Sequence, residues 1–190
     1  MRRRQAHGYT LIEVTIALAI GTLIFLTIGA LTKASADSMD YLSRTHRVDR
    51  DLRRSLDWIC EELKTASLAG IALDQSDADH DSIEYQTEQG GSWGYPNKLG
   101  VFQPNWSARL VVNGADLVLQ RLNPGGAQQS TKILCRHVDV AFDDGTSTTK
   151  GFAVDINGEL VTLQLRVHER FDDGRDYRRT ERTLVHVVND

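Results

Sequence analysis

The sequence has little of what several protein classes require. Its 190 residues include only two cysteines, too few for the disulfide framework of a small cysteine-rich fold. Lys and Arg total 22 against 26 Asp and Glu, so no basic excess indicates bulk binding of nucleic acid. The six histidines lack metal-ligand spacing, and neither a nucleotide-binding glycine loop nor a supported catalytic triad is present. We therefore expect a protein that is not an enzyme.

Charge is absent from one long stretch near the N-terminus. Residues 14–32 contain no charged side chain, and as a helix rising about 1.5 Å per residue they would extend about 28 Å. A bilayer's hydrocarbon core is about 30 Å thick. Arg2, Arg3 and Arg4 precede the stretch, whereas Lys33, Asp37 and Asp40 follow it, so we predict one membrane span with its basic N-terminus in the cytoplasm.

Glu13 lies at the start of this span, where an unpaired carboxylate costs on the order of 2.5 kcal/mol. If the chain were cut after Gly8, the new amino group of Tyr9 would lie about one helical turn from Glu13. A neighbouring chain's amino group would pair with it equally well. In the alternative reading, Glu13 sits at headgroup depth, near the positive end of the helix dipole.

The small residues Ala34, Ser35 and Ala36 fit a different cleavage signal. An ordinary signal peptidase would cut after Ala36 and release a soluble secreted protein. The apolar run, however, is longer than the roughly 7 to 15 residues of a normal signal core. Glu13 would also interrupt that core.

The same N-terminal residues resemble the type IV prepilin and type II secretion pseudopilin family. A basic leader, Gly8, the aromatic Tyr9, Thr10-Leu11-Ile12, Glu13 and an apolar run follow in the family's order and spacing. The resemblance implies cleavage between Gly8 and Tyr9 by prepilin peptidase, methylation of the Tyr9 nitrogen, and subunit docking guided by Glu13. Implied partners are other pilin or pseudopilin subunits and an inner-membrane assembly platform.

Segments farther along, such as Trp58–Leu63, resemble PilW-like minor pilins or GspJ-like pseudopilins. A minor subunit of a type IV pilus or type II secretion pseudopilus is therefore the expected function. The alternative is a single-span, membrane-anchored periplasmic binding protein that does not polymerise.

Beyond the span, apolar residues recur at helical spacing. This pattern predicts one helix from Tyr9 to Ala66, ended by Gly70, whose charged opposite face is solvated. The stripe consists of Leu42, Val48, Leu52, Leu56, Ile59, Leu63 and Ala66.

After Gly70 the sequence changes to β-branched alternation with tight-turn dipeptides at Asn113-Gly114, Asn157-Gly158 and Asp173-Gly174. The last turn would set Arg166 opposite Glu181 and Glu169 opposite Arg178. Predicted strands are 82–87, 99–103, 108–112, 116–122, 132–142, 153–156, 159–169 and 177–188.

These elements predict an α+β fold in which a long N-terminal helix packs on an antiparallel β-sheet, as in pilins. The helix spans the membrane in its first half and is amphipathic in its second. The expected parts are a leader at 1–8, a transmembrane segment at 9–32, an amphipathic periplasmic segment at 33–69 and a sheet domain at 70–190.

Three further candidate sites remain open. Asp77, Asp79, Asp81 and Glu88 fall at positions 1, 3, 5 and 12 of a calcium-loop template, although Ser82 replaces its glycine; a solvated acidic turn is the alternative. Cys60 and Cys135 would form a disulfide worth about 4 kcal/mol, or remain buried free thiols. Residues 90–94 fit the Gly-x-Ser-x-Gly pattern of hydrolases, but no helix is predicted after it, so a loop is expected.

Overall fold

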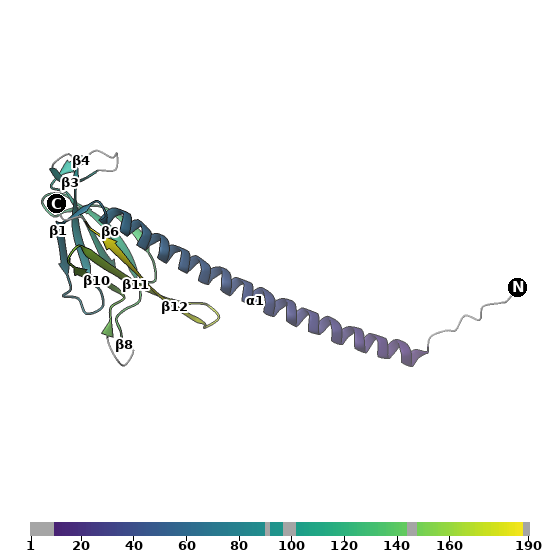
Figure 1. Cartoon of the computed structure of the whole chain (residues 1–190). Helices are drawn as coiled ribbons and strands as arrows, with labels where there is room; N and C mark the ends of the chain where they lie inside the picture. Colours follow the sequence, from purple (N-terminus) through teal and green to yellow (C-terminus); the bar gives the residue numbers. More distant parts are fainter. Residues whose placement is uncertain (1–9, 90–91, 97–101, 144–147, 188–190) are drawn as a thin grey trace. The chain divides into compact units, whose positions relative to one another are not determined.

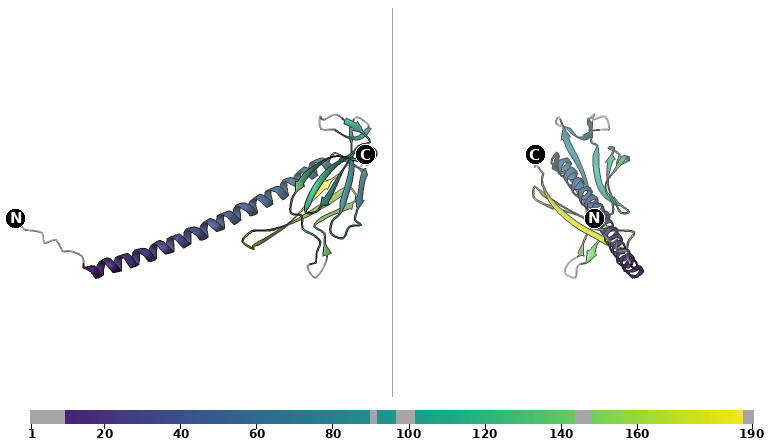
Figure 2. Two further views of the ribbon diagram at one scale, coloured as in Figure 1. Left: turned by 180° about the vertical axis from the view of Figure 1, so that it is seen from behind. Right: turned by 90° about the vertical axis from the view of Figure 1, so that its right-hand side faces the viewer.

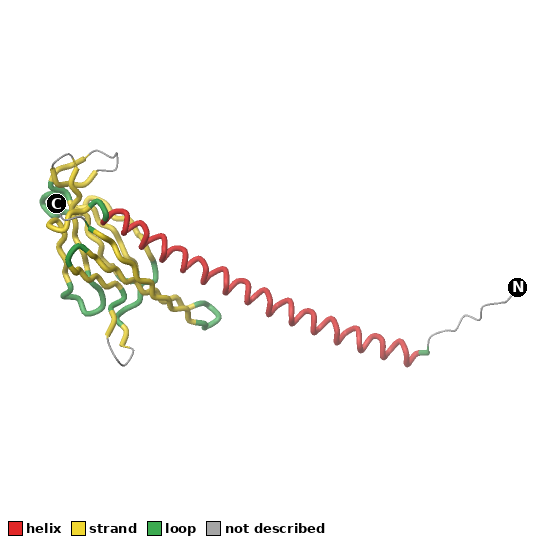
Figure 3. Tube along the Cα trace, in the orientation of Figure 1, coloured by secondary structure: helices red, strands yellow, loops and turns green. Residues whose placement is uncertain are grey.

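The computed structural model describes residues 10–89, 92–96, 102–143 and 148–187. Over these ranges one helix, α1 (Leu11–Leu63), is followed by strands alone (Figures 1 and 3). This confirms the predicted α+β class. The strands are β1 (Ala66–Asp74), β2 (Ser82–Gln89), β3 (Ser92–Pro96), β4 (Phe102–Pro104), β5 (Ser107–Asn113), β6 (Asp116–Leu122), β7 (Gln128–Cys135), β8 (Phe142–Asp143), β9 (Thr148–Thr149), β10 (Phe152–Asn157), β11 (Leu160–Arg170) and β12 (Asp176–His186).

The chain divides into two units, Met1–His46 and Arg47–Asp190. In the described part of the first unit, residues 11–46 are all helical. The second unit begins with the C-terminal part of α1 and contains every strand.

The predicted end of the helix was wrong. The last helical turn closes with Lys64 N–H donating to the Cys60 carbonyl at 3.0 Å, and β1 begins at Ala66. Gly70 lies inside β1, at an irregularity in the pairing register between Ala66 and Ile71. The chain adopts the extended strand conformation from Ala66, four residues before Gly70, because β1 pairs with β2 and Ala66 is buried. These tertiary contacts override the helix that the spacing of apolar residues predicts.

Antiparallel pairing builds two main sheets and a small hairpin. The larger sheet has the strand order β4-β3-β2-β5-β6-β7, and β1 also pairs with β2. The second sheet has the order β10-β11-β12, and β8 pairs with β9. Two predicted hairpin turns are confirmed, with Gly114 and Gly158 at φ angles of 63° and 59°, in the left-handed region that glycine adopts at little cost.

The predicted register of the last hairpin was wrong by one residue. Leu165, not Arg166, lies opposite Glu181, and Glu169 lies opposite Tyr177. The chain reverses over residues 171–175 between the paired Arg170 and Asp176, so the turn is centred on Asp173. A one-residue slip exchanges the two faces of a strand, and the buried Val161, Leu163, Leu165 and Val167 fix the register observed.

Two other strand predictions also need correction. The strand expected over 132–142 stops at Cys135, because His137 adopts a positive φ of 60° that breaks the extended chain. Residues 92–94, part of the loop expected at 90–94, instead belong to β3, whereas 90 and 91 lie outside the described residues. A Cβ at Gly94 would collide with the backbone of Gln103 and Pro104 in β4, so only glycine allows this close pairing.

Within the second unit, residues 47–63 of α1 fill the space between the two sheets. Leu52, Leu56, Ile59 and Leu63 are at most 4% exposed and belong to one core cluster with residues of both sheets. On one side the helix contacts β7, where Ser55 donates to the Leu134 carbonyl. On the other side it contacts β12, as the right view of Figure 2 shows.

Candidate functional site: the N-terminal helix and the acidic loop

The N-terminal part of α1 exposes an unbroken apolar surface. Twelve large apolar side chains between Leu11 and Leu31 are 50–89% exposed. Among the described residues, α1 is the helix long and apolar enough to cross a membrane, with a mean hydropathy of 2.4 over its most apolar 18 residues. At about −0.3 to −0.6 kcal/mol for each such side chain, twelve contribute at most about −4 to −7 kcal/mol to insertion. This favourable free energy of insertion is larger than the cost of about 2.5 kcal/mol for placing the unpaired Glu13 carboxylate in the membrane.

The polar side chains of this segment are satisfied by the helix itself. The hydroxyls of Thr15, Thr22, Thr27 and Thr32 donate to backbone carbonyls three or four residues earlier. Because each hydroxyl has an internal acceptor, it carries no unsatisfied donor into an apolar surrounding. The threonines are thus compatible with a membrane or with a dry helix bundle.

Glu13 completes a capping box with Thr10 at the start of the helix. The backbone N–H of Thr10 donates to Glu13 Oε2 at 2.8 Å, and Thr10 Oγ1 donates to the same oxygen at 3.0 Å. The Glu13 N–H donates back to Thr10 Oγ1 at 3.3 Å. A Thr-x-x-Glu sequence is the known signal of this motif, whereas sequence reasoning considered for Glu13 only an amino group or the helix dipole.

Small residues continue along the helix face that carries Glu13. An open hollow on this face is lined by small residues and Glu13 together with larger apolar side chains: Glu13, Val14, Ala17, Leu18, Gly21, Thr22 and Phe25. A helix backbone approaches a neighbour closely where side chains are small. Gly8 and Tyr9, the predicted cleavage and methylation residues, lie outside the described residues.

A family model described as the prokaryotic N-terminal methylation motif matches residues 3–29. No curated protein and no solved structure matches the chain. The matched segment contains the capping box and most of the exposed apolar helix, and it is the N-terminus of a prepilin-like protein. The N-terminal segment is accordingly that of a type IV prepilin-like protein, and the described residues have an α+β, pilin-like architecture with one helix long and apolar enough to anchor the chain in a membrane.

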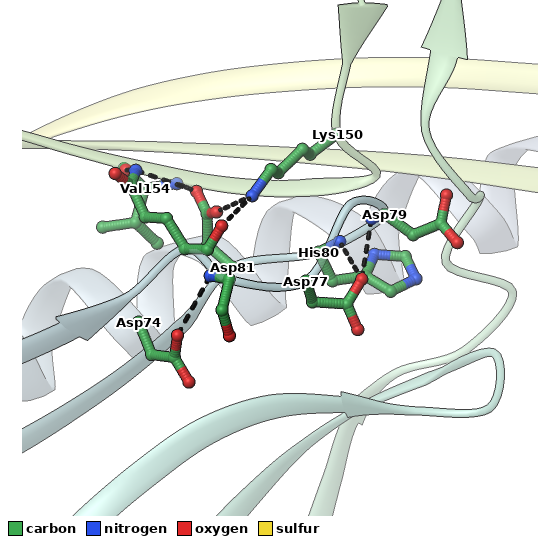
Figure 4. A network of polar contacts seen from close by, with 9 residues as sticks. Asp74, Asp77, Asp79, His80, Asp81, Lys150 and Val154 are labelled. Atoms are coloured by element: carbon green, nitrogen blue, oxygen red, sulfur yellow. Dashed lines mark hydrogen bonds and ion pairs between the residues drawn. The ribbon is translucent and has the colours of Figure 1, made fainter.

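The acidic loop between β1 and β2 joins the two sheets (Figure 4). Asp81 is 3% exposed, and its carboxylate lies 2.7 Å from Lys150 Nζ and accepts the Val154 N–H at 2.7 Å. Lys150 also donates to the Gln75 carbonyl, at 2.9 Å. A parallel bridge between His80 and Phe152 continues the contact with β10. Lys150, which sequence reasoning missed, thus neutralises the buried carboxylate.

The other loop carboxylates bind backbone N–H groups. Asp77 accepts those of Asp79 and His80, which lowers the pKa of its carboxyl, and Asp79 accepts that of Ala141 at 3.0 Å. Among the described residues no three His, Cys, Asp or Glu are arranged to hold a metal ion, and the Glu88 side chain lies outside the description. Calcium binding stays a prediction. The carboxylates that would bind the ion already accept hydrogen bonds from donors within the protein.

Of the two alternatives for the cysteines, the disulfide is not formed, and both are free thiols. Cys60 Sγ lies 3.6 Å from Thr183 Oγ1 on β12, whereas Cys135 ends β7. Ser55, the helix residue that contacts β7, is about 140° from Cys60 around the helix axis at roughly 100° per residue. The thiols therefore face different sheets, and of the expected two buried thiols only Cys135 is buried, whereas Cys60 is half-buried. Burial raises the pKa of Cys135 to about 11.

Proposed function

We propose that this chain is a minor pilin or pseudopilin, a structural subunit of a type IV pilus or a type II secretion pseudopilus. Prepilin peptidase cleaves it after Gly8 and the new amino group of Tyr9 is methylated. The subunit waits in the inner membrane with its N-terminus toward the cytoplasm and its sheets in the periplasm. The assembly platform then transfers it into the filament. The match of residues 3–29 to the methylation motif carries this proposal.

The work of such a subunit is physical, not catalytic. Its apolar helix surface is stable in lipid or against the helices of neighbouring subunits, because both surroundings exclude water. Transfer between them exchanges one apolar contact for another. Glu13 gives the exchange its specificity, since a carboxylate in an apolar surrounding is stabilised by a partner of opposite charge.

The amino group of a neighbouring subunit is the natural partner of Glu13. In the free subunit both contacts from Thr10 reach Oε2 of the carboxylate. These neutral donors satisfy hydrogen bonding but leave the negative charge uncompensated. A methylated ammonium group supplies the missing charge, and charge-assisted hydrogen bonds are about twice as strong as neutral ones.

The deciding experiment determines the mature N-terminus by mass spectrometry, in cells with and without prepilin peptidase. A methylated Tyr9 that depends on the peptidase supports the proposal. A chain beginning at Asp37 would instead identify a secreted protein cleaved after Ala36. An intact Met1 in both strains would identify a simple membrane anchor.

Assembly is tested separately with Glu13→Ala, using Glu13→Asp as the control that retains the charge. We expect Glu13→Ala to be processed and inserted normally but lost from sheared filaments, with Glu13→Asp partly incorporated. Normal incorporation of Glu13→Ala would contradict the assigned role of the carboxylate. A processed chain that never enters a filament in its wild-type form would favour the non-polymerising anchored binding protein.

A further inference from the structure

An open groove of about 570 Å³ runs along the second unit between α1 and the edge strand β7. Its walls are helix residues between Arg47 and Trp58, residues 132–137, and Glu169. β7 is an end strand of the larger sheet, so the groove lies at that sheet's edge, beside the contact between Ser55 and the Leu134 carbonyl. Edges of this kind commonly receive partner chains.

Positive charge gathers in this groove. Arg47, Arg54, Lys132 and Arg136 line it together with two acids, Asp51 and Glu169, which leaves a local balance of 4 − 2 = +2. All four cations are exposed. Lys132 Nζ lies 4.5 Å from the centre of the Trp58 ring. Across the described ranges, no ion pair involves Arg47, Arg54 or Arg136.

The opposite charge is concentrated in another segment of the same unit. Residues 74–88 contain six acidic residues and no Lys or Arg. Glu84 is paired with Arg109 and Asp81 with Lys150, whereas Asp74 and Asp77 are exposed and have no ion pair within the described part of the chain. Backbone N–H groups lower the pKa of both exposed carboxyls, so Asp74 and Asp77 are negatively charged at neutral pH.

We propose that the groove binds the acidic loop of a second copy of this chain, with Arg54 and Arg136 facing Asp74 and Asp77. The loop's two exposed carboxylates match the groove's excess of two positive charges. Nucleic acid fits less well, because the whole chain carries 22 basic against 26 acidic residues and repels a polyanion.

The loop cannot reach the groove of its own chain. Hydrogen bonds to Gly151 and Phe152 attach it to β10. In the larger sheet β2, which follows the loop, is separated from β7 by β5 and β6, so three strand spacings of about 4.8 Å place the two edges roughly 14 Å apart. Groove and loop are different patches, and their contact is heterologous. A heterologous contact between two copies does not close, so it leaves one groove and one loop unoccupied.

This inference rests on the proposed function, because only copies held in one membrane or filament reach the required local concentration. Exposed ion pairs are individually weak. Confinement raises the effective concentration of the second partner to the millimolar range for a short tether. The contact is therefore expected among membrane-anchored copies and not in dilute solution.

A charge-swap experiment on the full-length protein tests the contact. Two differently tagged copies are produced in the same cells, chemically crosslinked in the intact membrane, then extracted in detergent and co-purified. The groove variant carries Arg54→Glu and Arg136→Glu, and the loop variant carries Asp74→Lys and Asp77→Lys. Arg50→Glu, on an exposed helix position that does not line the groove, is the matched control. An unchanged melting temperature verifies that each variant is folded.

We expect each variant, paired with itself, to co-purify at least fivefold less than the wild type, because both patches then carry the same charge. Pairing the groove variant with the loop variant restores complementary charges in both directions and should return co-purification to the wild-type level. The control should behave as the wild type.

Three results would overturn the proposal: wild-type copies that do not co-purify, variants that lose nothing, or a mixed pair that recovers nothing. If the groove variant is no longer incorporated into filaments although wild-type copies never co-purify, the groove binds a different subunit. The assignment to a second copy is then wrong. The methylation state of Tyr9, measured in the same samples, reports on the proposed function separately.

Discussion

Asp81 is the residue whose loss should most weaken the connection between the two sheets. Asp81→Ala leaves the Lys150 ammonium, 23% exposed, without its carboxylate and leaves the Val154 N–H without its acceptor. Breaking a buried pair costs about 3–5 kcal/mol, and because Lys150 retains some access to water we expect about 3 kcal/mol. For a unit of this size that corresponds to a fall in melting temperature of roughly 6–12 °C.

The assay is thermal unfolding of the full-length protein in detergent, followed by tryptophan fluorescence. Trp58 and Trp106 pack against the core of the second unit and report its opening. Asp155→Ala, at an exposed position on β10, is the control and should change stability by less than about 0.5 kcal/mol. Adding Lys150→Met to Asp81→Ala should recover part of the loss, because the uncompensated charge is removed.

A loss below about 1 kcal/mol for Asp81→Ala, the size of one ordinary hydrogen bond, would refute this reasoning. The same samples test the calcium prediction for the loop. A calcium-dependent rise in the wild-type melting temperature, abolished by a chelator and by Asp77→Ala, would demonstrate binding.

Three further predictions concern single groups. Thr10→Ala should destabilise the start of the helix by about 1 kcal/mol and raise the hydrogen-exchange rate of the Glu13 amide about fivefold. Thr10→Ser, which keeps the hydroxyl, should leave that rate unchanged. An unchanged rate in Thr10→Ala would contradict the capping role. Maleimide at pH 8 should label Cys60 at least tenfold faster than Cys135, whose pKa of about 11 leaves roughly one thiolate in a thousand; mass spectrometry of the labelled peptides decides. Burial raises the pKa of Glu62 above 4.5, so its stabilising contribution is present at lower pH and is lost as pH rises through the folded-state pKa. Glu62→Gln should remove that loss in melts between pH 4 and 7, and an unaltered pH profile would refute it.

The sequence predicts best where one local pattern meets no competitor. The uncharged run after Glu13 predicts a helix, and the Asn-Gly pairs at 113–114 and 157–158 predict hairpin turns. The structure has the helix and both hairpins. Boundaries and register were missed where distant residues decide. The strand that includes Gly70 forms because β2 is present to pair with it, and the last hairpin follows the buried face of β11.

The candidate sites divide in the same way. Glu13 was identified from charge alone, and Thr10 was within reach because the Thr-x-x-Glu spacing is a recognised capping signal. The role of Lys150 could not be predicted, since no pattern connects it with Asp81, 69 residues earlier. The orientation of Cys60 away from Cys135 likewise depends on how two sheets enclose the helix.

The enclosure of α1 between β7 and β12, both far from it in sequence, determines when the protein finishes folding. Tyr177 donates to Asp49, and Thr183 lies beside Cys60, across sequence separations of 128 and 123 residues. Closing such long loops is slow. The helix is synthesised first, but its stripe of Leu52, Leu56, Ile59 and Leu63 remains uncovered on one side until β12 has formed. A newly made chain therefore completes its core only with its last strand, and until then it exposes an apolar helix face to whatever surrounds it.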